Sequence, residues 1–360
     1  MFFYLFIMFF VLVFASLLKF SRTKKQVFCI KSLIFLLLFI PAALRFQPGE
    51  DYIRYLNTYY ELKEGWKLPE LEIGYRLLVK LVILFKLHPQ CIFVFFSAFT
   101  YLFILKCENK VFFPIILVYL VFWFFPSLVI IRNALSFSLS FYSLYYYLNG
   151  KRKKWVIYIL LACMFHNTAF IYALIYFLGE YITFSKRKVL LMAIIVIILG
   201  NILTIPVLCT ILSPVLSEKY LFYLRGDYAL GFATSNLGLG ILLRRGLLFS
   251  SFCLVDKKFI KSEKEYTIIS FSFILLIICE VYLFSFPAIY RLMYIGSLYY
   301  FLVFKNLYYN NRNYSIILYK IIFIIFLFIL NTYLPFNKSP SLIPYQTFWG
   351  KDFNEYNRFY

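Results

Sequence analysis

The sequence is poor in acidic residues and histidine, and it lacks the common catalytic motifs. Its 360 residues include 16 Asp and Glu against 37 Lys and Arg, and only two histidines. No DxD, Walker A, GxGxxG, GxSxG or HExxH pattern occurs. These absences disfavour a metal-held nucleotide sugar, nucleotide-driven chemistry, a zinc protease and a serine nucleophile. We predict no cofactor and no metal.

The cysteines form no recognisable framework. Seven are scattered singly along the chain, without a CxxC pattern or a Cys/His cluster. A zinc site or a disulfide framework is therefore not expected. The net charge of +21 comes from basic residues in short loops between apolar runs, a pattern that sets membrane orientation rather than one typical of nucleic-acid binding. We predict no nucleic-acid partner.

Long apolar runs dominate the chain. Hydrophobic residues make up 63% of it, whereas soluble domains average about 45–50%. No polar stretch is long enough to fold as a separate soluble domain. The first 20 residues lack a basic start and an A-x-A cleavage site, so we interpret them as a retained span. We predict one all-α, polytopic membrane domain, residues 1–360, in contact with membrane lipid.

About twelve runs are predicted to span the membrane, since each approaches the length that a bilayer requires. The pair around His166 is expected to be broken, because its first member is short. A further run, 73–87, carries Arg76 and Lys80 and is predicted to be a surface helix. The predicted spans are 3–20, 27–44, 91–105, 111–128, 133–148, 155–166, 168–184, 189–205, 237–255, 266–285, 288–304 and 314–334.

Charge asymmetry predicts the orientation. The six loops that follow spans one, three, five, seven, nine and eleven carry 18 basic and 4 acidic residues, whereas residues 45–90 carry 7 basic and 6 acidic. The positive-inside rule therefore places both termini outside the cell membrane. Three segments become extracytoplasmic: the 45–90 loop with its surface helix, the 206–236 loop and the 335–360 tail.

Several arginines then gather on the extracytoplasmic side, and they suggest an anionic ligand. Charge within the membrane costs roughly 2.5–3.5 kcal/mol on insertion scales, and guanidinium groups match phosphate oxygens with paired donors. A lipid-linked diphosphate is the natural anion at this depth. The alternative for a single arginine is a snorkelling anchor. The candidates are Arg45, Arg132, Arg225, Arg244 and Arg291.

The other candidate site residues can also be explained by a purely structural role. His166 is either functional or a hydrogen-bonded packing residue. Tyr52, Tyr55 and Tyr75 can stack on sugar rings or belong to an interfacial aromatic belt. Arg244 and Arg245 are adjacent and so do not share a helix face; at least one is expected to pair internally, with Glu280 as a candidate.

The order of these motifs resembles the EpsG-like family of polysaccharide polymerases, the Wzy-type enzymes that join O-antigen, capsule or exopolysaccharide repeat units. The resemblance covers nearly the whole chain, although each motif is short. Asn133 stands where the family usually has glutamine. The matching positions are Arg45, Gly49, Asp51, Tyr52, Arg132, Phe165, His166, Arg291, Pro344 and Tyr345.

The resemblance implies a GT-C-like helical bundle in the bacterial inner membrane, acting on its outer face. The implied activity is glycosyl transfer from one undecaprenyl-diphosphate-linked oligosaccharide to another, the donor and the acceptor. A chain-length regulator and a flippase are further partners that such a system implies. The sugars, the linkage and the anomeric outcome stay open.

We assign roles as hypotheses. Arg132 and Arg291 would hold the diphosphate with help from Arg45, and Asp51, His166 or Glu72 would act as the base. Substrate-binding roles are expected for Tyr52, Tyr55, Glu72, Arg225, Arg244 and Tyr345. An O-antigen ligase is the nearest alternative, although no long late periplasmic loop is present. A flippase or exporter is the non-enzymatic alternative, but no internal repeat is visible.

Overall fold

The computed structural model describes residues 1–47, 49–202, 239–260, 262–282, 289–309, 314–329 and 345–349, with single positions besides. Regular structure in this part of the chain is helical. The isolated backbone bridge recorded there joins Arg45 to Thr347. The predicted all-α architecture is confirmed for the described residues.

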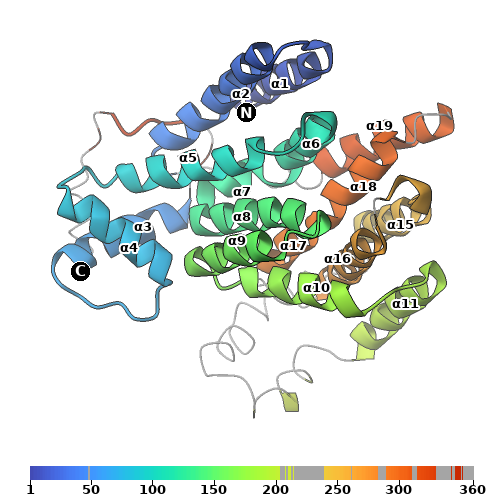
Figure 1. Ribbon diagram of the computed structural model, residues 1–360. Helices are drawn as coiled ribbons and strands as arrows, with labels where there is room; N and C mark the ends of the chain where they lie inside the picture. Colours follow the sequence, from blue (N-terminus) through green and yellow to red (C-terminus); the bar gives the residue numbers. More distant parts are fainter. Residues whose placement is uncertain are drawn as a thin grey trace. The chain divides into compact units, whose positions relative to one another are not determined.

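The chain divides into two compact units. Figure 1 labels the helices and colours them along the sequence. Unit 1 consists of Met1–Ala173 with Leu318–Tyr360, and unit 2 of Leu174–Ile317. A single integral domain stays a prediction.

The helices of unit 1 are α1 (Phe2–Leu17), α2 (Lys24–Leu44), α3 (Glu50–Lys63), α4 (Ile73–Leu84), α5 (Cys91–Leu105), α6 (Phe112–Phe122), α7 (Phe124–Val129), α8 (Ile131–Leu148) and α9 (Arg152–Phe165). Those of unit 2 are α11 (Lys186–Ile202), α15 (Leu239–Cys253), α16 (Glu263–Tyr282), α17 (Ile289–Gly296) and α18 (Leu298–Tyr309). Two helices, α10 (Ala169–Tyr181) and α19 (Tyr314–Phe328), contain the boundaries between the units.

Three described helical segments are long and apolar enough to cross a membrane: Phe2–Phe20, α2 and α16. Others, such as α5, α6 and α10, are apolar but shorter. The protein is therefore a helical membrane protein, and the number of twelve spans stays a prediction.

Two predicted spans are not continuous helices. The 111–128 run is divided at Trp123 into α6 and α7, and the 288–304 run is divided at Ser297 into α17 and α18. Pro126 lies three residues after the first break. Its ring excludes the carbonyl four residues earlier and it has no N–H to donate, so a straight helix through Phe122 is disfavoured.

Helix α8 is the centre of unit 1, where it packs against α5, α7 and α9. Small polar side chains allow these helices to approach closely, as is common between membrane helices. Ser143 Oγ donates to the Trp155 carbonyl of α9 at 2.9 Å, and the Phe137 ring of α8 stacks on Trp123 at 4.0 Å. The buried serines of α8 are Ser136, Ser138, Ser140 and Ser143.

Unit 1 has two chemically different ends. At one end, Lys31 Nζ of α2 donates to the carbonyls of Leu105 and Cys107, at 2.9 and 3.0 Å. At the other, Gln90 Nε2 at the start of α5 donates to the carbonyls of Ala43 and Arg45, at 2.7 and 3.0 Å. We call the second the Arg132 end, because α8 begins there.

Helix α4 starts and finishes at the Arg132 end. Its first turn lies on the end of α9, at Met164, and the chain after it leads to Gln90 beside Arg45. One face of α4 is buried at Tyr75, Val79 and Val82, and the opposite face exposes Leu77 and Leu81. The helix ends at Leu84 rather than residue 87, and its placement at the membrane surface stays a prediction.

The expected break at His166 is confirmed. Helix α9 ends at Phe165, His166 is extended with φ −158° and ψ 130°, and α10 begins at Ala169. The imidazole is therefore presented on a short irregular connection rather than on a helix face.

Candidate active site

Arg132 and Glu72 form the central contact of the candidate site. Arg132 is the second residue of α8, and Glu72 is the N-cap of α4. Arg132 Nη1 lies 2.5 Å from Glu72 Oε2, and the two side chains are 17% and 10% exposed. Charge-assisted pairs of this kind are short and strong. Sixty positions of sequence separate the two residues, so only the tertiary fold brings them together.

Two tyrosines contact the Arg132 guanidinium. Its Cζ lies 5.6 Å from the Tyr55 ring centre and 5.0 Å from that of Tyr75, within cation–π range. The two rings meet edge to face at 5.8 Å. Burial raises the pKa of Tyr55 above its ordinary value, and the charge of Arg132 acts against that rise. The guanidinium is thus held in one orientation by neutral aromatic faces.

Two glycines allow the close packing that positions the helices carrying these residues. A Cβ on Gly74 would lie 2.8 Å from the Met164 carbonyl oxygen, so only glycine lets α4 rest directly on α9. Gly49, with φ +151°, precedes α3, and a Cβ there would lie 2.9 Å from Val129 Cγ1. Both approaches place Tyr55 and Glu72 next to the start of α8.

A second polar network lies beside Arg132. His166 Nδ1 and Thr168 Oγ1 are 2.8 Å apart, and Thr168 Oγ1 donates to Asn133 Oδ1 at 3.3 Å. Asn133 is buried, and its Nδ2 has no hydrogen-bond partner. His166 is therefore joined to the residue after Arg132. Thr168 was missed from the sequence, where the only signal for it is its place two residues after His166.

Arg45 is buried more deeply than Arg132. It is 1% exposed and donates to the Ala42 carbonyl and to Ser97 Oγ, the latter at 3.2 Å. Its Nε and Nη2 are buried without a hydrogen-bond partner, and no carboxylate of the described residues pairs with it. Its Cζ lies 5.2 Å from the Phe93 ring, which is in turn 6.0 Å from Tyr55. Arg45 thus packs against Phe93, which in turn packs against Tyr55 of the site.

The tyrosines expected to meet sugar rings lie inside the protein. Tyr52 is 1% exposed, stacks on Phe93 at 4.4 Å and donates its hydroxyl to Gln90 Oε1 at 2.8 Å. Tyr55 is 4% exposed. We therefore assign both a packing role, because no open ring face remains for a sugar. Asp51 lies in the first turn of α3, half-buried, and its charge acts on Tyr55.

The Tyr345 segment is anchored at the same end. The Tyr345 hydroxyl donates to the Pro41 carbonyl at 2.9 Å, and its ring stacks on Phe3 at 4.5 Å. Nearby, Phe46 N donates to the Gln346 carbonyl at 2.9 Å. These bonds tie the residues around 345 to the connection between α2 and α3.

The remaining candidates belong to unit 2 or lie outside the described residues. Arg225 and Pro344 are outside them, as is most of the 206–236 loop and of the tail after 335. Arg291 is the third residue of α17, but its side chain is not described. These residues keep their predicted roles as proposals only.

Arg244 is neutralised within unit 2. Its Nε lies 3.2 Å from Glu280 Oε2, and Arg245 Nη2 donates to the Glu280 carbonyl at 3.1 Å. The expected internal pairing with Glu280 is confirmed. Both long side chains thus reach the same residue of α16, one at its carboxylate and the other at its backbone carbonyl.

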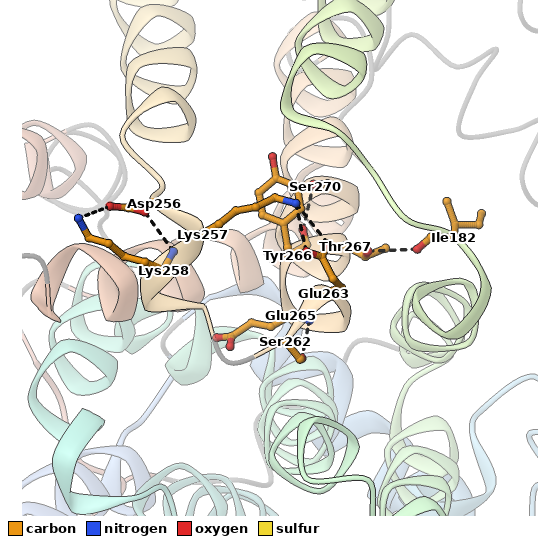
Figure 2. Close-up of polar contacts among 10 residues, drawn as sticks. All are labelled: Ile182, Asp256, Lys257, Lys258, Ser262, Glu263, Glu265, Tyr266, Thr267 and Ser270. Carbon is orange, nitrogen blue, oxygen red and sulfur yellow. Dashed lines mark hydrogen bonds and ion pairs between the residues drawn. The ribbon is translucent and has the colours of Figure 1, made fainter.

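Unit 2 also contains a polar cluster around the start of α16, shown in Figure 2. Lys257 Nζ lies 3.2 Å from Glu263 Oε1 and 4.5 Å from the Tyr266 ring, and Lys258 pairs with Asp256 at 2.8 Å. Asp256 accepts hydrogen bonds from Lys258, which lower its pKa. Beneath this exposed layer, Glu265 forms a buried ion pair with Lys305 of α18. No group of three potential metal ligands occurs within the described ranges.

The comparison with known families decides the broad identity. The EpsG family model matches residues 28–347, most of the chain. The chain belongs to the EpsG family. The match includes both Arg132 and Glu72, and EpsG membership places the protein in polysaccharide biosynthesis at a membrane. No curated protein and no solved structure matches the chain.

Proposed function

We propose that this EpsG-family protein is a repeat-unit polymerase, a glycosyltransferase that joins undecaprenyl-diphosphate-linked oligosaccharides on the outer face of the bacterial inner membrane. The observation that carries the proposal is Arg132, a cation held by two tyrosines beside a carboxylate at the end of unit 1 away from the basic loops. A rigid guanidinium suits a diphosphate leaving group.

The reaction exchanges one carbon–oxygen bond for another. The acceptor hydroxyl oxygen bonds to the anomeric carbon of the donor, and the bond from that carbon to the lipid diphosphate breaks. The diphosphate leaves with the bonding electrons, and the acceptor proton passes to a base. Arg132 stabilises the charge that develops on the leaving group, while Asp51, His166 and Glu72 are the candidate bases. A role for Arg291 in binding the diphosphate stays a separate proposal that rests on the sequence alone.

Chain-length ladders of surface polysaccharide in cells test this proposal. Arg132→Lys keeps the positive charge beside Glu72 but removes the planar guanidinium, which can donate two parallel hydrogen bonds to a phosphate. We expect polymerisation to fall about 10²-fold or more, as when an enzyme loses one hydrogen-bond donor to its transition state. His166→Ala and Arg291→Ala should likewise leave single repeat units at the surface with normal protein abundance.

Matched controls exist for two of these variants. Arg54→Gln removes an exposed cation from α3, and His88→Asn replaces the only other histidine with a residue that can accept the same local bond from Gln90 N. Both should give normal ladders. Normal ladders from Arg132→Lys, His166→Ala and Arg291→Ala together would refute the polymerase site. Loss of lipid-linked units from the outer face would indicate a flippase instead.

A further inference from the structure

The Arg132 guanidinium is bonded at Nη1 by a carboxylate of the same chain. Nη1 is bonded to Glu72, Nε is buried without a partner, and Tyr55 and Tyr75 lie within cation–π distance of the group. A carboxylate and a phosphate present oxygens to guanidinium in the same way. Glu72 Oε2 therefore fills a position beside Nη1 that also suits a phosphate oxygen.

The two partners of this pair are held very differently. Arg132 lies on α8, the buried centre of unit 1, whereas Glu72 follows a connection whose residues 64–67 are exposed. Gly65 in that connection has φ +96°, and nothing lies within 4 Å of the position of a Cβ there. If the pair separates, the Glu72 carboxylate can turn away by rotation of its own side chain, while α4, packed at Gly74, and the cation stay in place.

We propose that Glu72 occupies the diphosphate position of the empty site and is displaced from Arg132 when the donor binds. The inference rests on the proposed function and adds an order of events to it. An unpaired cation in this buried place is costly, so Glu72 neutralises it until the diphosphate does so. Displacement releases a carboxylate beside the donor, which links donor binding to the appearance of a free base.

Binding of inorganic pyrophosphate and of undecaprenyl diphosphate to the purified full-length protein, in phosphatidylcholine nanodiscs, tests the exchange. Glu72→Gln removes the competing charge, so we expect both ligands to bind about tenfold more tightly or better, since the wild-type affinity is reduced by the fraction of sites that Glu72 occupies. The same variant should polymerise more slowly than the wild type.

Two further variants keep the result interpretable. Glu70→Gln removes an exposed carboxylate two residues away and should bind as the wild type does. Glu72→Asp keeps the charge on a shorter side chain and should bind both ligands with intermediate affinity. This variant replaces Glu72→Gln in the test if Glu72→Gln folds poorly.

The outcomes separate the two proposals. Unchanged or weaker pyrophosphate binding by both Glu72 variants overturns the exchange, even if polymerisation is lost. Wild-type binding of both ligands by Arg132→Lys and Arg132→Gln overturns Arg132 as the diphosphate site, and with it the basis of the exchange. Tighter binding by Glu72→Gln that disappears in the Arg132→Gln/Glu72→Gln double variant supports both.

Discussion

The Arg132–Glu72 pair of unit 1 and the Lys305–Glu265 pair of unit 2 have the same charges in different settings. In unit 2 both partners lie on packed helices, and their side chains are 11% and 2% exposed. In unit 1 the carboxylate belongs to the N-cap residue of α4, makes no side-chain capping bond to that helix, and follows an exposed connection. A buried pair between fixed helices is structural, whereas a pair with one movable partner can exchange its anion. The following substitutions test this difference.

The largest effect is expected in unit 2. Lys305→Met leaves Glu265 buried without its cation, so we expect a loss of about 3–5 kcal/mol in stability. Lys305→Met/Glu265→Leu replaces the pair with apolar groups and should recover most of it. Thermal unfolding in detergent and abundance in membranes measure both. Wild-type stability of the single variant would contradict a structural role.

The corresponding double variant in unit 1 sharpens the contrast. Arg132→Met/Glu72→Leu should also be stable, because no unpaired charge remains. However, it should produce only single repeat units in a ladder assay, because the group that binds the diphosphate is gone. Normal ladders from this variant would show that the unit 1 pair, like the unit 2 pair, has only a structural role.

A smaller effect is expected from the contact between α4 and α9. Gly74→Ala places a methyl group 2.8 Å from the Met164 carbonyl oxygen, so α4 must shift and carry Glu72 with it. We expect roughly 1–3 kcal/mol of destabilisation and shortened ladders. Gly246→Ala is the control: nothing lies within 4 Å of its Cβ position, and alanine favours a helix by about 1 kcal/mol. Equal effects of the two substitutions would count against the close approach.

The smallest effect concerns Tyr345. Tyr345→Phe removes the hydrogen bond to the Pro41 carbonyl and keeps the stack on Phe3, so stability should fall by about 0.5–1.5 kcal/mol. If Tyr345 instead contacts sugar, as the sequence suggested, polymerisation should fall with no change in the melting temperature. Unfolding and ladder measurements on the same preparations separate these outcomes.

Much of the site could be predicted because it depends on local features. His166 ends a run too short to span a bilayer, and the helix does end there. Arg132 follows a long apolar stretch and opens the next helix. The environments were harder to foresee: Tyr52 and Tyr55 look like surface aromatics in sequence, yet both are buried. Their burial depends on Phe93 and Gln90 from a different helix.

The sequence by itself determined that this is a helical membrane protein with its unusual arginines near helix ends. The cost of placing a charge in lipid is a property of each residue and its neighbours along the chain, so the pattern of apolar runs is sufficient. Only the tertiary structure decided that Arg132 meets Glu72 and that Arg45 meets no carboxylate within the described part of the chain. Those pairings require helices distant in sequence to pack at particular contacts, such as Gly74 on Met164, and no local pattern specifies them.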